Sequence, residues 1–328
     1  MDFENESERH EQPDLVTTLD ALARAEEGNL SATIFYGLSN LPYDDALQVR
    51  PVWDRLPSSA RRKILREMID LSEANFEMDF GAIGWFGLDD ADSAVREASI
   101  EVLWEDESTE LMNRLIEMVQ WDEVPEVRAA AASAIGRFVL LGELGDIPES
   151  AFNTVQEAVV NVLTNLDEDV DVRRRALEAI ANSSHEIVEE AIQEAYTGDE
   201  RRMQVSAVFA MGRSCDPQWS DYVLRELTSD DPEMRYEAAR AAGELEVAEA
   251  VPHLTRLALD SDREVQDMAI WSLGEIGGKE ALRVLSAMAK DAEDQGDRDL
   301  REAIDDAIAT ANLASGSLSL FDFDQDER

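Results

Sequence analysis

One pattern recurs along this 328-residue chain and constrains its fold more than any other feature. An acidic turn is followed by an aliphatic residue, usually by an Arg, and then by an Ala-rich apolar segment. We call the aliphatic residue the anchor. The seven anchors are Val95, Val127, Val172, Met203, Met234, Val265 and Leu300, separated by 32, 45, 31, 31, 31 and 35 residues. A 31-residue period accommodates two short helices and two turns, so the chain is predicted to be an array of helical hairpins.

The segment after each anchor has the spacing of an amphipathic helix. Positions four, seven and eight after the anchor are small or apolar, as in Ala131, Ala134 and Ile135, which places them on one helical stripe. Position nine is glycine in four repeats: Gly136, Gly212, Gly243 and Gly274. A glycine at this position is typical of a helix end or of closely packed helices, and no bound ligand is required to explain it.

A second helix is predicted between successive anchors. These segments carry apolar residues at i, i+3, i+4 and i+7, and they cover residues 108–119, 149–163, 185–195, 217–227, 250–259 and 280–289. Residues 138–150 contain Gly and Pro and are expected to form a longer connection, which accounts for the 45-residue step.

The predicted organisation has four parts. Residues 1–13 form an acidic disordered tail, 14–88 an irregular helical cap, 89–312 the repeat array and 313–328 a second acidic tail. The second tail carries a predicted docking motif made of Leu320, Phe321 and Phe323 between aspartates. It is expected to bind another protein or to fold back onto the array.

The run AARAAGELEVAEAVPHLTRLALDSDREVQDMAIWSLGEIGGKEALRVL resembles the HEAT-like repeats of the phycobilisome-lyase type. An Ala-rich helix, a turn, an A-V-P-x-L helix and an acidic turn follow one another as in that family. The resemblance covers roughly residues 89–312 and implies an all-α, right-handed α-solenoid of HEAT/armadillo-like hairpins. Because such repeats occur in lyases, in hydroxylases and in pure adaptors, the resemblance does not specify an activity.

Charge limits the choice of partner. The chain has 29 Lys and Arg against 73 Asp and Glu, a formal charge of −44, which opposes binding to nucleic acid and to anionic membranes. A basic protein segment is electrostatically favoured, although the acidity also serves solubility alone. With no apolar leader at the N-terminus and no membrane-spanning stretch, we expect a soluble cytoplasmic protein.

No pattern typical of catalysis or of a cofactor is found. HEAT-repeat hydroxylases bind two irons through several His-Glu pairs, whereas this chain has His10-Glu11 in a tail, His185-Glu186 at a helix start and His253 before a leucine. We therefore expect no catalytic residue, no metal and no cofactor. Cys215 is the single cysteine and is expected to be a buried or half-buried inert thiol.

The Arg residues that follow most anchors can be interpreted as a basic ridge. Their regular position next to turn acids such as Asp92, Asp169 and Asp231 favours a structural ladder of ion pairs or helix caps instead. The arginines are Arg96, Arg128, Arg173, Arg235 and Arg301.

The face opposite the buried stripe is the candidate binding surface. Positions two and six after the anchor should lie on the concave side, and three successive repeats place Phe209, Tyr236 and Trp271 there. Arg213 and Arg240 should flank these rings as a local positive patch suited to an acidic-aromatic peptide, a composition typical of binding hot spots. The alternative is that the rings pack under a neighbouring loop or helix. The predicted function is a non-enzymatic scaffold that binds a protein or peptide. The alternative is a lyase-like or enzyme-associated HEAT protein that acts on a modified or chromophore-bearing protein.

Overall fold

The computed structural model describes residues 13–314. The predicted docking motif of Leu320, Phe321 and Phe323 lies outside the described residues, as does most of the predicted tail 1–13. Within the described range the chain forms eighteen α-helices and two short 3-10 turns, and it contains no strand. The predicted all-α array of helical hairpins is confirmed.

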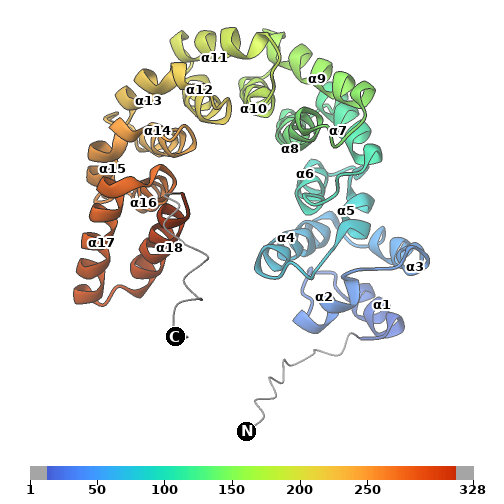
Figure 1. Ribbon diagram of the computed structural model, residues 1–328. Helices are drawn as coiled ribbons and strands as arrows, with labels where there is room; N and C mark the ends of the chain where they lie inside the picture. Colours follow the sequence, from blue (N-terminus) through green and yellow to red (C-terminus); the bar gives the residue numbers. More distant parts are fainter. Residues whose placement is uncertain (1–12, 315–328) are drawn as a thin grey trace, which may run out of the picture. The chain divides into compact units, whose positions relative to one another are not determined.

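The chain divides into two compact units, Met1–Ala176 and Leu177–Arg328, and the division falls within α10 (Val170–Ile180). Unit 1 contains two layers of helices (Figure 1): α4, α6 and α8 pack side by side in one layer, and α7 and α9 lie in the other. Its helices before α10 are α1 (Leu15–Ala23), α2 (Ala32–Leu38), α3 (Tyr43–Trp53), α4 (Ser58–Ala74), α5 (Gly81–Gly87), α6 (Ser93–Val102), α7 (Thr109–Trp121), α8 (Pro125–Leu144) and α9 (Glu149–Thr164).

Unit 2 repeats this two-layer arrangement. The helices that begin near the anchors pack against one another in the order α12, α14, α16 and α18, and the intervening helices cover them (Figure 1). The helices are α11 (Ile187–Thr197), α12 (Arg201–Arg213), α13 (Ser220–Glu226), α14 (Pro232–Glu244), α15 (Val251–Leu257), α16 (Arg263–Ile276), α17 (Gly278–Gln295) and α18 (Arg298–Ala314).

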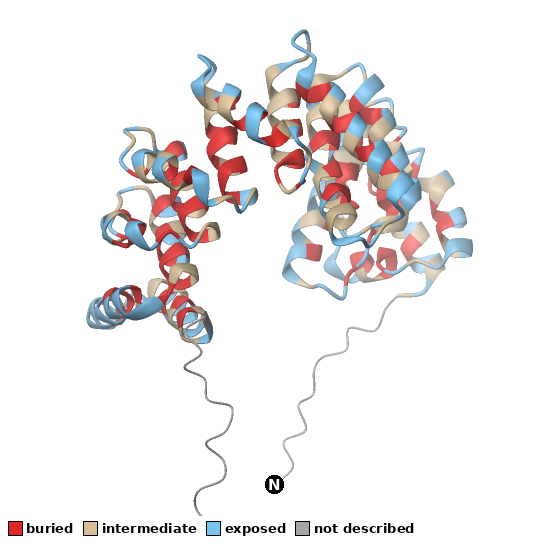
Figure 2. Ribbon diagram, turned by 45° about the horizontal axis from the view of Figure 1, so that its top comes forward, coloured by how far each residue is buried: buried red, intermediate tan, exposed pale blue. Residues whose placement is uncertain are grey.

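The predicted apolar stripe is the core of both units. Six of the seven anchors are buried, from Val95 to Val265, and Leu300 is half-buried. Small residues four positions later, such as Ala131 and Ala269, are fully buried. Buried and exposed residues therefore alternate around each helix (Figure 2), as expected for amphipathic helices in a layered array. None of the helices in residues 13–314 is long and apolar enough to span a bilayer.

Aspartates in the turns cap the helices. Asp92 accepts hydrogen bonds from the backbone N–H groups of Ala94 and Val95, and Asp262 makes the equivalent bonds at the start of α16. Such N-caps satisfy donors that the first helical turn leaves unpaired, each contributing about 1 kcal/mol. The acidic turns are thus helix-start signals.

The predicted arginine ladder is present at Arg96, Arg128 and Arg235, whose carboxylate partners belong to the following repeat. Arg173 instead donates to the carbonyl of Leu163, and Arg301 pairs with Glu293 and Asp305. Arg96 binds the carboxylate of Asp122 through two bonds of 2.7 Å and also donates to the carbonyl of Asp90 in its own turn. Arg235 likewise pairs with Asp260 at 2.9 and 3.0 Å. The side chains in both pairs are no more than 16% exposed. Arg96 and Arg235 therefore each link one acidic turn to the next.

The same contacts extend into the predicted cap. Arg61 of α4 pairs with Asp90 at 2.8 Å, and it follows Ala60, which is fully buried. The pair Ala60-Arg61 has the position of an anchor and its arginine, although no acidic turn precedes it in the sequence. Helix α4 therefore packs as a member of the array, which the sequence pattern did not predict.

The glycines at position nine allow close contact between successive repeats. A Cβ atom on Gly243 would lie 2.9 Å from the ring of Trp271 and 3.0 Å from the backbone of Ser272. One on Gly274 would lie 2.9 Å from the carbonyl oxygen of Ala307. The prediction of tight helix packing is confirmed at these positions.

Two expectations are wrong. Residues 138–144 continue α8 instead of forming a connection, because Phe138 and Val139 extend its buried face, and only 145–148 separate α8 from α9. Cys215 is exposed rather than buried. It lies just beyond α12 in the left-handed conformation (φ 51°), where its N–H bonds to the carbonyl of Gly212 and its side chain leaves the apolar stripe.

Candidate functional site

The five predicted binding residues lie on three neighbouring helices of unit 2. Phe209 and Arg213 belong to α12, Tyr236 and Arg240 to α14, and Trp271 to α16. We call these five residues the aromatic face. The structure leaves Trp271 39% exposed and Arg213 exposed, whereas the other three are half-buried. Val205, expected on the same side, is buried in the core.

Phe209 and the two arginines form one contact group. The guanidinium of Arg240 lies over the Phe209 ring, 4.3 Å from its centroid, and that of Arg213 lies at 5.7 Å. Both distances are within the range of attraction between a cation and an aromatic ring. Phe209 therefore positions two cations contributed by successive repeats.

Carboxylates compensate these cations, so the expected positive patch is absent from the described residues around Phe209. Glu244 accepts a 3.1 Å hydrogen bond from Arg240 and also pairs with Arg213 at 3.4 Å. Glu237 approaches Arg240 at 3.6 Å. Two arginines thus face two glutamate side chains, which compensate most of their positive charge.

Glu237 is the electrostatically strained member of this group. Burial raises the pKa of its carboxyl to about 7; Arg240 opposes this shift, and the nearby carboxylates of Glu178, Glu244 and Glu233 add to it. Its Oε2 atom is buried and has no hydrogen-bond partner within the described residues. The carboxyl group therefore changes charge near neutral pH.

Trp271 forms a wall of a hollow of about 430 Å³. Arg213, Arg240 and Met268 also line it, and the indole packs over Gly243. A bulkier residue than glycine at position 243 would displace the ring. The hollow thus combines an indole and a thioether with two arginines and the carboxylates of Glu244, Glu246 and Glu275, groups suited to contact an apolar side chain and its polar flank.

Tyr236 lines a second hollow of about 650 Å³ on the other side of Met268, which contributes to both. The second hollow is strongly acidic. Its carboxylates are Glu233, Glu237, Asp262, Glu264 and Asp267. Its lining contains no Lys or Arg, so it favours a cationic occupant.

Sequence reasoning missed three residues of this surface: Met268, Glu237 and Glu244. Met268 and Glu237 both lie three residues after their anchors, beside position two. Glu244 occupies position ten of its repeat, as Arg213 does in the preceding repeat. Tabulating positions three and ten along with two and six would have found all three.

The histidines show no catalytic arrangement in the described part of the chain. The Nδ1 atom of His185 accepts a hydrogen bond from the backbone N–H of Ile187, which makes it a local cap at the start of α11. His253 is half-buried, and its Nδ1 has no hydrogen-bond partner among residues 13–314. No group of three or more His, Cys, Asp or Glu residues within this range is placed to hold a metal ion.

Layered hairpins with a 31-residue period and an arginine ladder define a helical-repeat protein. Comparison with family models identifies the repeats: residues 220–305 match the model for HEAT repeats, and residues 111–141 match the model for a single HEAT repeat. The chain therefore contains HEAT repeats within these two ranges. No curated protein sequence matches it.

Several solved structures are similar to this chain at low identity. The complex of CpcE and CpcF of phycocyanin lyase from Nostoc sp. is 16% identical, with 88% of this chain and 99% of that chain covered and a TM-score of 0.47. Human deoxyhypusine hydroxylase is 15% identical, with 91% and 97% covered and a TM-score of 0.35. Kap95p in complex with RanGDP is 13% identical, with 90% and 45% covered and a TM-score of 0.42. Likeness at this level carries no information about activity.

Proposed function

We propose that this protein is a non-enzymatic HEAT-repeat scaffold that binds a segment of a partner protein along the aromatic face of α12, α14 and α16. The observation that carries the proposal is the exposed Trp271 at a hollow in which neighbouring groups hold Arg240 and the indole itself. Arg240 is held by Phe209, Glu237 and Glu244, and Trp271 rests on Gly243. A preformed surface of this kind loses little side-chain entropy on binding.

The charges favour a basic segment over an acidic one. Arg213 and Arg240 are already paired with glutamates, and five carboxylates line the adjoining hollow around Tyr236. Arg240 lies beside Glu237 and Arg263 pairs with Asp267, but the other three carboxylates keep the hollow net negative, which disfavours an acidic peptide and favours a Lys or Arg side chain. We therefore assign to the partner an apolar or aromatic residue for the Trp271 hollow and a cationic residue for the Tyr236 hollow.

A peptide-display selection against the full-length protein tests this proposal. Random peptides are selected on the wild-type protein and then depleted on a Trp271→Ala, Tyr236→Ala double variant, so that the surviving peptides depend on the aromatic face. The proposal predicts enrichment of Lys or Arg close to a large apolar residue. Selected peptides that are acidic, or that bind both proteins equally, would contradict it.

A further inference from the structure

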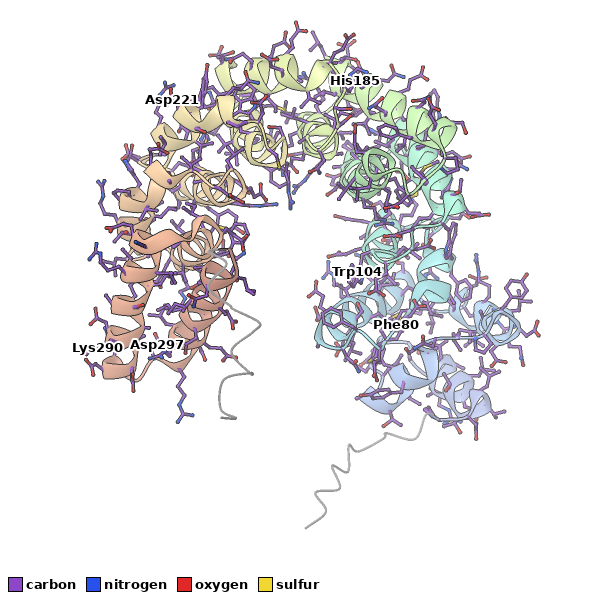
Figure 3. All side chains as sticks on the ribbon, in the orientation of Figure 1. Phe80, Trp104, His185, Asp221, Lys290 and Asp297 are labelled. Atoms are coloured by element: carbon purple, nitrogen blue, oxygen red, sulfur yellow. The ribbon has the colours of Figure 1, made fainter. Side chains whose placement is uncertain are left out.

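A third hollow lies in unit 1, and none of the five predicted binding residues lines it. It has a volume of about 420 Å³ and is formed by the end of α4, the start of α5 and the turn after α6. Met78, Phe80, Trp85 and Trp104 provide its apolar lining. Figure 3 labels Phe80 and Trp104, which lie in the same part of the unit.

Trp104 is the unusual member. It stands nine residues after the anchor Val95, the position that glycine occupies in four other repeats. Its side chain is 44% exposed, and its indole N–H has no hydrogen-bond partner within residues 13–314. This indole stands where other repeats have a packing glycine, and the part of it that its neighbours leave uncovered is available to a ligand in the hollow.

The charged groups of the hollow are all carboxylates: Asp79, Glu105 and Asp106. Asp106 is fixed, because its Oδ2 accepts a 2.9 Å hydrogen bond from the indole of Trp85 and its Oδ1 accepts one from the backbone of Ser108. Oδ1 of Asp79 accepts a 2.7 Å hydrogen bond from the backbone N–H of Gly81. Glu105 is exposed and makes no ion pair within the described part of the chain.

The nearest cation lies behind the hollow and does not line it. Arg137 donates to the carbonyl oxygen of Leu103 at 3.0 Å and stacks over Phe138 at 4.9 Å, and its charge acts on Asp106 and Glu107. It therefore offsets part of the charge of Asp106. Asp79 and Glu105 have no ion-pair partner within residues 13–314, and they line the hollow together with two indoles.

We propose that this hollow binds a cationic side chain, an arginine or a lysine, of a partner protein. Indole rings attract cations through their electron-rich faces, and nearby carboxylates add to this attraction where the ligand is partly desolvated. The formal charge of −44 raises the local concentration of basic segments around the whole molecule, and this hollow gives one residue of such a segment a specific position. The assignment is independent of the aromatic face in unit 2.

Fluorine NMR of the full-length protein labelled with 5-fluorotryptophan tests the assignment. The six tryptophans give six resonances, which are assigned from single Trp→Phe variants. The probes are three capped tripeptides, Ac-Ala-Arg-Ala-NH2, Ac-Ala-Lys-Ala-NH2 and Ac-Ala-Cit-Ala-NH2, in which citrulline is the neutral isostere of arginine. Trp121, which is 80% exposed and outside the hollow, reports on non-specific accumulation of cations.

We expect saturable shifts of Trp104 and Trp85 with a cationic peptide, with an affinity at least about fivefold higher than for the citrulline peptide. Whichever of the arginine and lysine peptides binds with the higher affinity shows which side chain the site prefers. The double variant Asp79→Asn, Glu105→Gln should bind the cationic peptide about fivefold more weakly. Its spectrum without peptide should remain that of a folded protein. Equal shifts from the cationic and citrulline peptides, shifts of Trp121 that match those of Trp104, or no shift at all would overturn the proposal.

Discussion

The substitution Glu237→Gln should stabilise the protein above neutral pH and leave it unchanged near pH 4.5. In the folded state the Glu237 carboxyl has a pKa of about 7, compared with an ordinary value of 4.5. Between these pH values the folded protein holds a proton that the unfolded chain has released. The free energy of unfolding of the wild type therefore falls as the pH rises through this window.

The size of the effect follows from the shift in pKa. Ionising the buried carboxyl in the folded state rather than in the unfolded chain costs about 3 kcal/mol, since each factor of ten in proton affinity corresponds to about 1.4 kcal/mol. Glutamine has the same shape and no charge to desolvate. The variant should thus gain about 3 kcal/mol over the wild type at pH 8, and the gain should vanish near pH 4.5.

Urea unfolding of both proteins at half-unit intervals from pH 4.5 to 8.5 measures this difference. Glu233→Gln is the matched control, because Glu233 lines the same hollow but its side chain is exposed. A stability difference between Glu237→Gln and the wild type that is constant with pH, or that grows as the pH falls, would refute the reasoning. An equal gain in Glu233→Gln would show that the effect is a change in net charge rather than relief of burial.

Three further predictions concern the array as a whole. Arg235→Gln leaves the carboxylate of Asp260 buried without its partner and should cost about 3 kcal/mol at pH 7 by urea unfolding, whereas Arg283→Gln, whose pair is exposed, should cost almost nothing. The hydrogen bond from Arg235 lowers the pKa of Asp260. The pair therefore stabilises the folded protein above about pH 4, and this stabilisation is lost as the pH falls through the lowered pKa. Equal losses of stability for Arg235→Gln at pH 7 and at pH 2 would contradict this. Cys215 should react with a thiol reagent in the native protein within about tenfold of its rate in urea, and strong protection would show that it is buried. The melting temperature should rise between 0.1 and 1 M NaCl as the screening length falls from about 10 to about 3 Å, and a falling value would show that ion pairs outweigh the net repulsion.

The repeat period predicted the larger part of the fold. The anchors, the buried stripe and the intervening helices depend on local pattern alone, and each hairpin contacts only its neighbours, so no long-range pairing had to be deduced. The length of α8 was missed because Gly142 was taken as a loop signal. In the structure a Cβ atom on Gly142 would lie 2.0 Å from the ring of Phe152, so this glycine serves helix packing inside α8.

The two surfaces differ in how far the sequence predicted them. The positions of Phe209, Tyr236 and Trp271 on neighbouring helices follow from the period, but the pairing of Arg213 and Arg240 with Glu244 depends on side-chain geometry that spacing does not specify. The hollow in unit 1 could not be predicted in this way, because Trp85 precedes the first anchor. Its one sequence signal is Trp104 at a glycine position.

The Trp104 hollow also bears on how the protein would engage a partner. Burial alone would raise the pKa of Asp106, but hydrogen bonds from Ser108 and Trp85 hold it below its ordinary range, so this carboxylate stays ionised at neutral pH. A fixed negative charge beside two indoles needs no rearrangement to accept a cation. Each unit therefore carries a preformed surface of its own, with carboxylates beside aromatic rings.

The central claim is that the aromatic face of unit 2 binds a partner segment, and an isothermal titration tests it most directly. A peptide from the display selection is titrated into the wild type, Trp271→Ala and Trp121→Ala, the last being a control on an indole that is 80% exposed and outside the face. Loss of a hot-spot indole costs about 2 kcal/mol or more, so Trp271→Ala should weaken binding at least about 30-fold while Trp121→Ala leaves it unchanged. Equal affinity for all three proteins, or equal losses in both variants, would contradict the claim.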